Sequence, residues 1–290
     1  MKKFKTIGIY SSSGSAKAFS IANQVEEILT SRGCRVLYDD SFFLSHKKIK
    51  KNTRSKYFIK KNADLIISIG GDGSMLSCSR EYGSFGIPVL GVNLGKVGFL
   101  TDIAPDELTT KLLEVIGGKF VVDERFFIEV KLKGNRKRLI ALNEVVIHSG
   151  AIAQLIEYDL YIDGNFVFRQ KSDGLIISSP TGSTAYSLSG GGPIVHPSLD
   201  AITLVPMFPH SLSSSPLVIK GESNIKIITF NPNHKYQLNF DSHISFDLKG
   251  KNEINISKTN SVLKLIHPED HDFFDGCRNK LGWSSGIVNP

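Results

Sequence analysis

Apolar and polar positions in the first third of the chain predict strands that alternate with helices. Thr6 to Tyr10 is a short β-rich run. After a Ser/Gly segment, apolar residues from Ala18 to Leu29 recur at helical spacing. Gly33 is expected to end this helix, and residues 35–38 are expected to form a second strand. The first 40 residues therefore predict a strand, a helix and a second strand.

Two further apolar runs, 64–69 and 87–92, are typical of strands buried on both faces. The first leads directly into Gly70-Gly71-Asp72-Gly73, and a helix-like segment follows at 74–80. Such alternation predicts a parallel sheet covered by helices on both faces, with ligands bound beyond the carboxyl ends of the strands. The glycine loops after both runs lie at such ends.

From about residue 120 the pattern changes to short alternating strands. Residues 156–162 and 165–168 flank Asp163-Gly164, which is typical of a hairpin. Further alternation occurs at 224–230, 236–240, 244–248 and 253–257. We therefore expect an α/β domain over 1–118 and a β-rich, sandwich-like domain over 119–266. The tail, 267–290, carries Phe273, Phe274, Leu281 and Trp283, and is expected to dock on one of the domains.

Composition and cysteine content change this picture little. The apolar, charged, glycine and proline contents are near globular averages. No apolar run approaches the roughly 20 residues of a membrane-spanning helix. Cys34, Cys78 and Cys277 are widely spaced, which argues against a disulfide framework and against a zinc site. A protein of the reducing cytoplasm, without a membrane partner, is expected.

The formal charge of +7 comes from one basic patch between Lys47 and Lys61. Eight lysines and arginines lie there with no acidic residue among them, and the remaining chain is close to neutral. The simplest interpretation is a solvated loop or helix face. Attraction of an anionic nucleotide, or contact with a nucleic acid, stays open as an alternative, and we expect no nucleic-acid partner.

The loop Gly70-Gly71-Asp72-Gly73 has the features of a phosphate-binding segment. Three glycines let backbone N–H groups approach anionic oxygens, and the start of a helix adds a favourable dipole. A carboxylate here would repel phosphate, so we expect Asp72 to accept a proton from a hydroxyl or to hold a divalent cation. The alternative is a tight Asp-Gly turn at a strand end.

A second stretch rich in glycine and hydroxyl groups runs from Asp173 to Ser187 and continues to Gly190-Gly191-Gly192. Small side chains leave room for a planar ligand, and Tyr186 offers a ring for packing. Asn143 and Glu144 precede another apolar strand, and adjacent amide and carboxylate groups suit a ribose diol. A solvated Ser/Gly loop is the alternative for the longer stretch.

Other chemistries lack their patterns. The histidines show no H-E-x-x-H, so no metal cage is assigned. Residues 91–97 resemble a P-loop but lack one residue and the Ser/Thr. No G-x-S-x-G elbow is present, which argues against a serine hydrolase.

Taken together, the motifs resemble the bacterial-type ATP-NAD kinases. They are G-G-D-G, N-L-G-K-V-G-F-L-T at 93–101, N-E-V-V at 143–146, P-M-F-P-H at 206–210, L-G-W near the end, and the D-G-L-I-I-S-S-P-T-G-S-T-A-Y-S-L-S-G-G-G-P stretch from Asp173. The resemblance covers nearly the whole chain. It implies transfer of the γ-phosphoryl group of ATP to the 2′-hydroxyl of the adenosine ribose of NAD, with a divalent cation such as magnesium. It also implies a two-domain fold and a homodimer or homotetramer.

The resemblance also implies roles for individual residues. Asp72 corresponds to the proton acceptor, and Gly73 lies beside the dinucleotide. Asn143 and Glu144 match the pair that engages NAD, and Lys171 and Gln154 fall at positions that vary in type among relatives. The positions that match the nucleotide pocket are Asp173, Thr184, Ala185, Tyr186 and Ser187.

His243 departs from the family pattern. Relatives commonly carry D-S-Q or D-G-Q where this chain has Asp241-Ser242-His243. An imidazole changes charge between pH 5 and 8, so we expect the affinity for NAD to depend on pH.

Two rival functions stay open. Another G-G-D-G kinase, lipid-directed or phosphofructokinase-like, would use the same loop. A non-catalytic nucleotide-binding or nucleic-acid-binding protein would instead use the basic patch.

Overall fold

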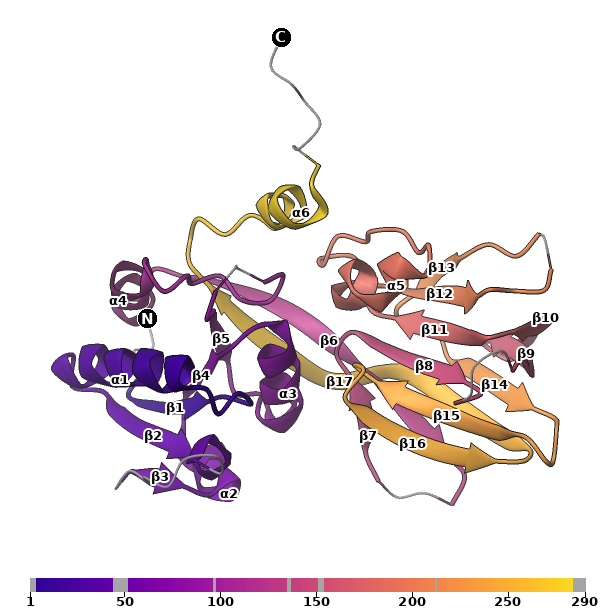
Figure 1. Cartoon of the computed structure of the whole chain (residues 1–290), viewed down its shortest axis with the longest axis horizontal. Coiled ribbons are helices and arrows are strands. Elements are labelled where there is room, and N and C mark those ends of the chain that lie inside the picture. The colour runs from indigo at the N-terminus through magenta and orange to yellow at the C-terminus, as the bar shows by residue number, and fades with distance from the viewer. Residues whose placement is uncertain are drawn as a thin grey trace, which may run out of the picture. The chain divides into compact units, whose positions relative to one another are not determined.

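The computed structural model describes residues 4–43, 52–95, 98–134, 137–150, 154–211 and 213–283. They belong to two compact units (Figure 1). Unit 1 comprises Met1–Glu124 and Leu263–Pro290, and unit 2 comprises Arg125–Val262. Half of the basic patch, namely Lys47, Lys48, Lys50 and Lys51, lies outside the described residues, as do Lys96, Val97 and the tail beyond Trp283.

The sheet of unit 1 is parallel, as the alternating pattern predicts. In spatial order its strands are β3 (Thr53–Arg54), β2 (Arg35–Asp39), β1 (Thr6–Tyr10), β4 (Leu65–Ile69), β5 (Val89–Val92) and the end of β17 (Asn252–His267). β17 was expected to end near residue 257 but continues to His267, where Leu265 and Ile266 pair with β5. The chain thus returns to unit 1 as a strand.

Helices cover both faces of this sheet. On one face α1 (Ala16–Ser31) and α4 (Leu108–Gly117) pack on the side chains that alternate inward, such as Ile7 and Ile67. On the other face Gly8 leaves room for α2 (Lys56–Asn62): a Cβ there would lie 2.6 Å from Ile66 and 3.1 Å from Ile59 of α2. α3 (Asp72–Glu81) and a short 3₁₀ helix, η2 (Gly83–Phe85), complete this layer, whereas η1 (Asp40–Phe43) places Phe42 in the core beneath α1. The expected two-sided cover is confirmed.

Unit 2 is built from two antiparallel sheets, which confirms the sandwich-like expectation. The first orders β10 (Asn165–Ser172), β9 (Ile156–Ile162), β14 (Ile225–Thr229) and β17, with β6 (Val121–Leu132) and β7 (Leu139–Ala141) beside them. The second orders β13 (Leu217–Lys220), β12 (Ala201–Met207), β11 (Gly174–Ser178), β8 (Glu144–His148), β15 (Lys235–Phe240) and β16 (Ile244–Lys249). Alternate residues of both sheets share one core.

The outer face of the second sheet is covered by the glycine and hydroxyl-rich stretch. Val146, Ile176 and Val205 form a small apolar cluster there. Above it lie η3 (Thr181–Thr184) and α5 (Tyr186–Ser189), and a Cβ at Gly190 would lie 3.0 Å from Ile176 and 3.2 Å from Val205. The stretch is therefore a packed element, as its apolar neighbours predict, and the solvated-loop alternative is wrong.

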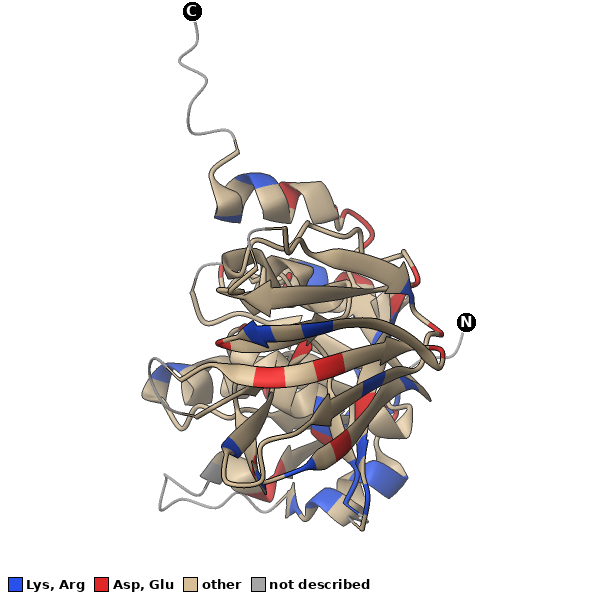
Figure 2. Ribbon diagram, turned by 90° about the vertical axis from the view of Figure 1, so that its right-hand side faces the viewer, with Lys and Arg blue, Asp and Glu red and all other residues tan. Residues whose placement is uncertain are grey.

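Lys and Arg positions alternate with Asp and Glu positions along the strands that face the viewer in Figure 2. Across β9 and β10 the guanidinium of Arg169 binds both carboxylate oxygens of Asp159 at 2.7 and 2.9 Å. No helix within the described ranges is long and apolar enough to span a membrane.

Candidate functional site

The G-G-D-G segment is the start of a helix rather than a loop that precedes one. α3 begins at Asp72, two residues before the expected start, because the carbonyl oxygen of Gly71 already accepts bonds from the amides of Ser74 (3.0 Å) and Met75 (3.2 Å). Gly70 must lack a side chain, since a Cβ would lie 2.2 Å from Ser74 Oγ. The first-turn amides, those of Asp72 and Gly73, have no partner within the helix and are available to an anion.

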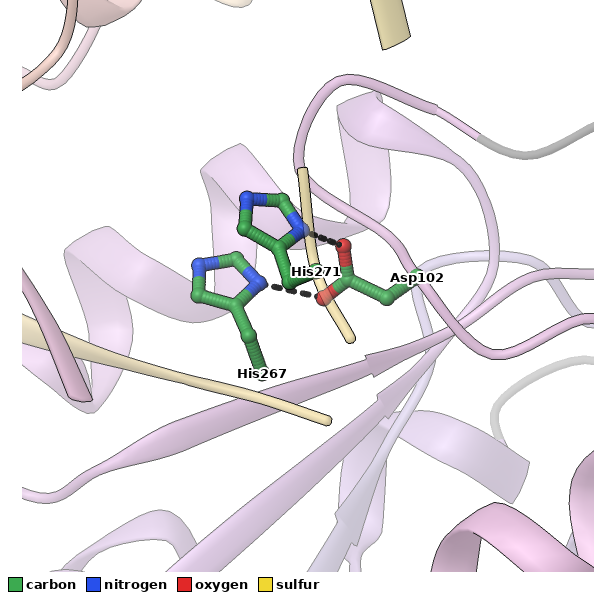
Figure 3. Close-up of side chains that lie close together, drawn as sticks. All are labelled: Asp102, His267 and His271. Carbon is green, nitrogen blue, oxygen red and sulfur yellow. Dashed lines mark hydrogen bonds and ion pairs between the residues drawn. The ribbon is translucent and has the colours of Figure 1, made fainter. Parts of the chain in front are cut away.

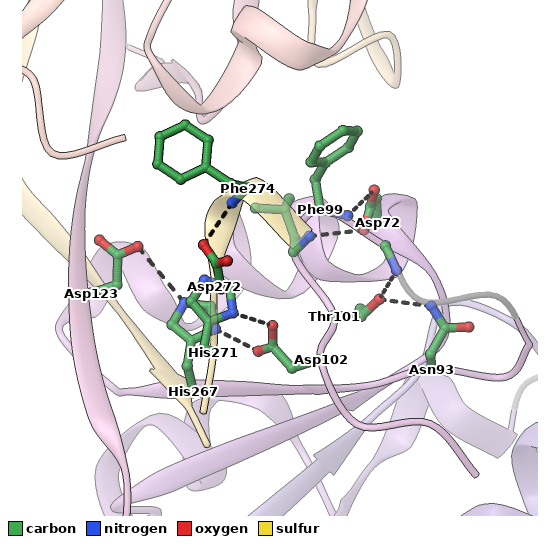
Figure 4. A network of polar contacts seen from close by, with 12 residues as sticks. Asp72, Asn93, Phe99, Thr101, Asp102, Asp123, His267, His271, Asp272 and Phe274 are labelled. Carbon is green, nitrogen blue, oxygen red and sulfur yellow. Dashed lines mark hydrogen bonds and ion pairs between the residues drawn. The ribbon is translucent and has the colours of Figure 1, made fainter. Parts of the chain in front are cut away.

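The carboxylate of Asp72 is held by a second segment of unit 1 (Figure 4). The backbone amide of Phe99 donates to Oδ2 at 3.0 Å, and that of Leu100 donates to Oδ1 at 3.1 Å. The ammonium group of Lys280, from α6 (Phe273–Leu281), lies 3.5 Å from Oδ2. The side chain is 34% exposed, so the carboxylate is fixed in direction and still reachable.

The segment that holds Asp72 is itself fixed by a hydroxyl group. Thr101 Oγ1 accepts hydrogen bonds from the amide of Gly98 (2.9 Å) and from the side chain of Asn93 (2.7 Å). Gly98 lies against the carboxylate, because a Cβ there would be 1.8 Å from Asp72 Oδ1. In the sequence, residues 93–101 stand out only through their resemblance to the family motif. The segment binds Asp72 through backbone amides, and the types of its residues do not reveal such a contact.

In unit 2, Asp241 determines the position of Asn143 and Glu144. Its carboxylate accepts bonds from the amides of Leu142 (3.1 Å) and Asn143 (2.7 Å), with the Glu144 amide at 3.4 Å. Its own amide donates to the carbonyl oxygen of Glu144 at 3.0 Å. In the sequence, Asp241 stands out only as part of the motif around His243. Its position directly after the alternating run 236–240 is the signal that could have identified it.

Three buried polar atoms of the predicted residues in unit 2 have no hydrogen-bond partner among the described residues: Asn143 Oδ1, Glu144 Oε2 and Ser187 Oγ. All three residues are less than 10% exposed. Gly182 brings the covering stretch against Asn143, since a Cβ there would lie 2.3 Å from the carbonyl oxygen of Asn143. Because buried polar groups are ordinarily satisfied, these atoms are available to a ligand that supplies their partners.

The carboxyl group of Glu144 is poised to be neutral near pH 7. Burial, with a smaller contribution from the charge of Asp241, raises the pKa of Glu144 to about 8. A protonated carboxyl group can both donate and accept a hydrogen bond. Asn143 and Glu144 therefore offer a donor and acceptor set of the kind that recognises neighbouring hydroxyl groups.

The remaining predicted residues of unit 2 differ in their surroundings. Thr184 and Ala185 join η3 to α5 and are half-buried, and Tyr186 is 40% exposed. Asp173, also half-buried, precedes β11, and its amide donates to the carbonyl oxygen of Met207 at 2.9 Å. Lys171 is exposed on β10 and lies 3.7 Å from Glu157.

Gln154 and His243 occupy two other places in unit 2. Gln154 lines a cavity of about 970 Å³ whose other described walls include Ser149, His234 and Tyr236. His243 follows two non-glycine residues in the left-handed conformation, Asp241 and Ser242. Its Nδ1 lies 2.5 Å from the carbonyl oxygen of Asp241, so Nδ1 is the protonated nitrogen and Nε2 faces away. The turn therefore places His243 close to Asp241, whose carboxylate binds the amides of Asn143 and Glu144.

One cluster in unit 1 was not anticipated, because its members are far apart in sequence. Asp102, His267 and His271 bring one ligand-type atom each to within 4.8 Å of one another (Figure 3). The spacing of the histidines along the sequence predicts no metal cage. The two histidines are four residues apart, a spacing that carries weight only once Asp102 is known to lie beside them.

Two family models match the chain. Residues 7–120 match the ATP-NAD kinase N-terminal domain, and residues 142–268 match the ATP-NAD kinase C-terminal domain. An NAD kinase from Marinobacter nauticus is 43% identical over 99% of both chains. An NAD kinase from Teredinibacter turnerae is 44% identical over the whole of both chains.

Solved structures match the fold as well. Yeast NADH kinase complexed with NADH has a TM-score of 0.85 and 26% identity, covering 100% of this chain and 91% of that one. An NAD kinase from Archaeoglobus fulgidus in complex with ATP has a TM-score of 0.73 and 26% identity, covering 96% of this chain and 97% of that one.

The raised pKa of Glu144 predicts how stability varies with pH. Between the ordinary pKa of a glutamate and about 8, the folded chain binds a proton that the unfolded chain has lost, so this group's contribution to stability falls as the pH rises. Glu144→Gln removes the effect. We would measure the free energy of unfolding of both proteins in urea at pH 5 and pH 8. The value for the variant minus that for the wild type should increase by on the order of 3 kcal/mol from pH 5 to pH 8. A difference independent of pH would contradict the assigned shift.

The close approach at Gly98 predicts a sharp contrast between two glycines of one segment. Gly98→Ala should lower the free energy of unfolding by about 1 to 3 kcal/mol, because the new methyl group overlaps the Asp72 carboxylate. Gly95→Ala is the matched control, since a Cβ there meets nothing within 4 Å. Denaturant unfolding of both variants measures the contrast, and equal stabilities would show that Gly98 has room to spare.

Proposed function

The chain belongs to the ATP-NAD kinase family, and we propose that Asp72 is the base of its reaction. The protein phosphorylates NAD to NADP with ATP. In the proposed step, the 2′-oxygen of the adenosine ribose attacks the γ-phosphorus of ATP while Asp72 takes the hydroxyl proton. The bond from that phosphorus to the bridging oxygen breaks, and ADP leaves. The observation that carries this proposal is the carboxylate of Asp72 at the anion-binding start of α3.

The hydrogen bonds of Asp72 support this role. A carboxylate offers about four lone-pair positions, and the amides of Phe99 and Leu100 occupy one on each oxygen. Positions that face the 34% exposed side of the group are left for a hydroxyl. Because phosphoryl transfer depends on positioning more than on covalent chemistry, a base held by two amides suits the reaction.

The start of α3 is proposed to bind phosphate. The amides of Asp72 and Gly73 point out of the first turn, and Gly70 and Gly71 carry no side chains that would obstruct phosphate oxygens. Gly73 is proposed to lie beside the dinucleotide.

The unpaired atoms of Asn143, Glu144 and Ser187 are proposed to bind NAD. The amide oxygen and the neutral carboxyl group would pair with ribose hydroxyl groups, and Ser187 would contribute a third hydrogen bond. Tyr186 offers an exposed ring face on which a nucleotide base can pack. Asp173, Thr184 and Ala185 are proposed to line the same pocket.

Lys171, Gln154 and His243 are proposed as further contacts, on the strength of the family resemblance. Lys171 and Gln154 are both exposed and can reach a ligand without rearrangement of the core. His243 presents Nε2 outward, because Nδ1 is taken by the turn. A homodimer or homotetramer in the cytoplasm remains our proposal for the assembled enzyme.

A divalent cation, with magnesium as the expected ion, is proposed to enter with ATP. Asp72 supplies a hard oxygen donor of the type that magnesium prefers, but the ammonium group of Lys280 already lies 3.5 Å from Oδ2, and the free positions are proposed for the hydroxyl. The residues therefore fit an ion held chiefly by the phosphate oxygens of ATP. When bound, such an ion neutralises charge on the phosphates.

Replacing the base should remove turnover and spare binding. Asp72→Asn is expected to lower kcat by about 10²- to 10⁴-fold while the Kd for NAD changes little. Formation of NADP from ATP and NAD measures the rate, and titration with NAD measures the affinity. Asp106→Asn, the same change at an exposed carboxylate, is the control. A variant that keeps more than about a tenth of the wild-type kcat would rule out Asp72 as the base.

His243 should contribute to NAD binding. With Nδ1 bonded to the turn, Nε2 is the ring nitrogen left to pair with an oxygen of NAD. His243→Ala should therefore weaken NAD binding by about 5-fold, the worth of one hydrogen bond, whereas His243→Gln should keep most of the affinity. Equal affinities of wild type and His243→Ala in NAD titrations would show that His243 does not contact NAD.

A further inference from the structure

The cluster of Asp102, His267 and His271 arises from a strand end and a turn. His267 is the last residue of β17, and a turn closed by the His271 amide and the Pro268 carbonyl oxygen (3.1 Å) folds His271 back over it. The two rings stack, with centroids 3.9 Å apart and planes 18° apart. Asp102 reaches the pair from the segment after β5. Figure 3 shows both Nδ1 atoms directed at its carboxylate group.

The donor atoms are of the type and arrangement that transition-metal ions prefer. His271 Nδ1 lies 2.8 Å from Asp102 Oδ1, and His267 Nδ1 is bonded to Oδ2. Tetrahedral ions of the zinc class take two imidazole nitrogens and one carboxylate oxygen at about 2.0–2.2 Å, which places those atoms roughly 3.4 Å apart. The three atoms lie within 4.8 Å of one another, so an ion would draw them together and tilt the stacked rings toward it. Magnesium, in contrast, prefers oxygen donors.

The three side chains are largely withdrawn from solvent. His267 is 1% exposed and the Asp102 side chain is 12% exposed. Each carboxylate oxygen of Asp102 faces the Nδ1 atom of one histidine. An oxygen donor is therefore already present beside both nitrogens.

A second carboxylate occupies the position expected of an outer partner. His267 Nε2 is buried and has no hydrogen-bond partner among the described residues, and Asp123 Oδ2 lies 3.8 Å from it. A ring that binds a metal through Nδ1 carries its proton on Nε2. Metal-bound histidines almost always donate that proton to a carboxylate, a carbonyl oxygen or water. A metal at Nδ1 would thus give the buried Nε2 of His267 a donor role toward Asp123.

An acidic cavity leads to the cluster. Asp102 and His271 line a cavity of about 390 Å³ together with Glu107, Asp270, Asp272 and Asp275. Lys111 and Lys280 also contribute to its walls. Lys111 is paired with Asp270 at 2.6 Å, and Arg278 is paired with Asp272 and Asp275. The cavity gives an ion access to Asp102 and His271, and it has room for water as a fourth ligand.

We propose that Asp102, His267 and His271 form a binding site for a divalent transition-metal ion of the zinc class, with Asp123 as the outer partner of His267. The site is separate from the cation that accompanies ATP, because it needs no nucleotide and uses imidazole nitrogens. Asp102 follows Phe99 by three residues, so an ion bound here would also hold the segment whose amides position Asp72.

Cobalt and zinc titrations of the nucleotide-free protein, after treatment with a chelator, test the proposal directly. Wild-type protein should bind one Co²⁺ per chain with the intense visible absorption of a tetrahedral site, and Zn²⁺ should displace it. His271→Phe keeps the stacked ring and removes the ligand, and it should weaken binding more than about 100-fold. Asp123→Asn should weaken it by about 10- to 100-fold. His196→Ala, at an exposed histidine, is the control and should bind as the wild type does.

The wild-type spectrum keeps the test decisive even where a variant fails to fold. A wild-type titration with only the weak absorption of octahedral Co²⁺, or with no binding at micromolar metal, would overturn the proposal. Unchanged binding in folded His271→Phe would overturn it as well, because the ion would then lie elsewhere.

Discussion

The organisation of unit 1 depends on one interaction: the carboxylate of Asp72 accepts hydrogen bonds from two consecutive backbone amides. This contact joins the start of α3 to the segment around Phe99 and Leu100, and so joins the ends of two neighbouring parallel strands. It requires Gly98, which has no space for a side chain beside the carboxylate. A charged group that would otherwise repel phosphate is thereby fixed in direction at an anion-binding helix end.

Unit 2 relies on a similar device with a different outcome. The buried carboxylate of Asp241 holds the backbone of Asn143 and Glu144, and this leaves their side chains to face a region with unpaired polar atoms. Burial beside Asp241 keeps Glu144 largely neutral. In both units, an aspartate accepts hydrogen bonds from backbone amides and thereby fixes the position of a second segment. In unit 1 that aspartate is also the proposed reactive group, whereas in unit 2 it positions the groups proposed to bind the substrate.

The sequence could predict most of the strands and the class of each unit, because buried strands and hairpins leave local patterns. The run before Gly70 and the Asp163-Gly164 hairpin are examples. It could not predict that β17 continues into the sheet of unit 1, since pairing with β5 is a long-range property. Nor could it predict the amides that hold Asp72 or the cluster at Asp102. Backbone donors have no residue signature, and residues 165 positions apart meet only after folding.

Asp72 is proposed to receive the proton of the attacking hydroxyl group. A crystal structure of the protein with NAD and a non-hydrolysable ATP analogue would measure the distance between the carboxylate and that hydroxyl group. We expect an Asp72 carboxylate oxygen within roughly 2.6–3.2 Å of the ribose 2′-oxygen, with the amides of Phe99 and Leu100 still bonded to the carboxylate. A 2′-hydroxyl that instead donates to another carboxylate, with Asp72 out of hydrogen-bond reach, would contradict this proposal.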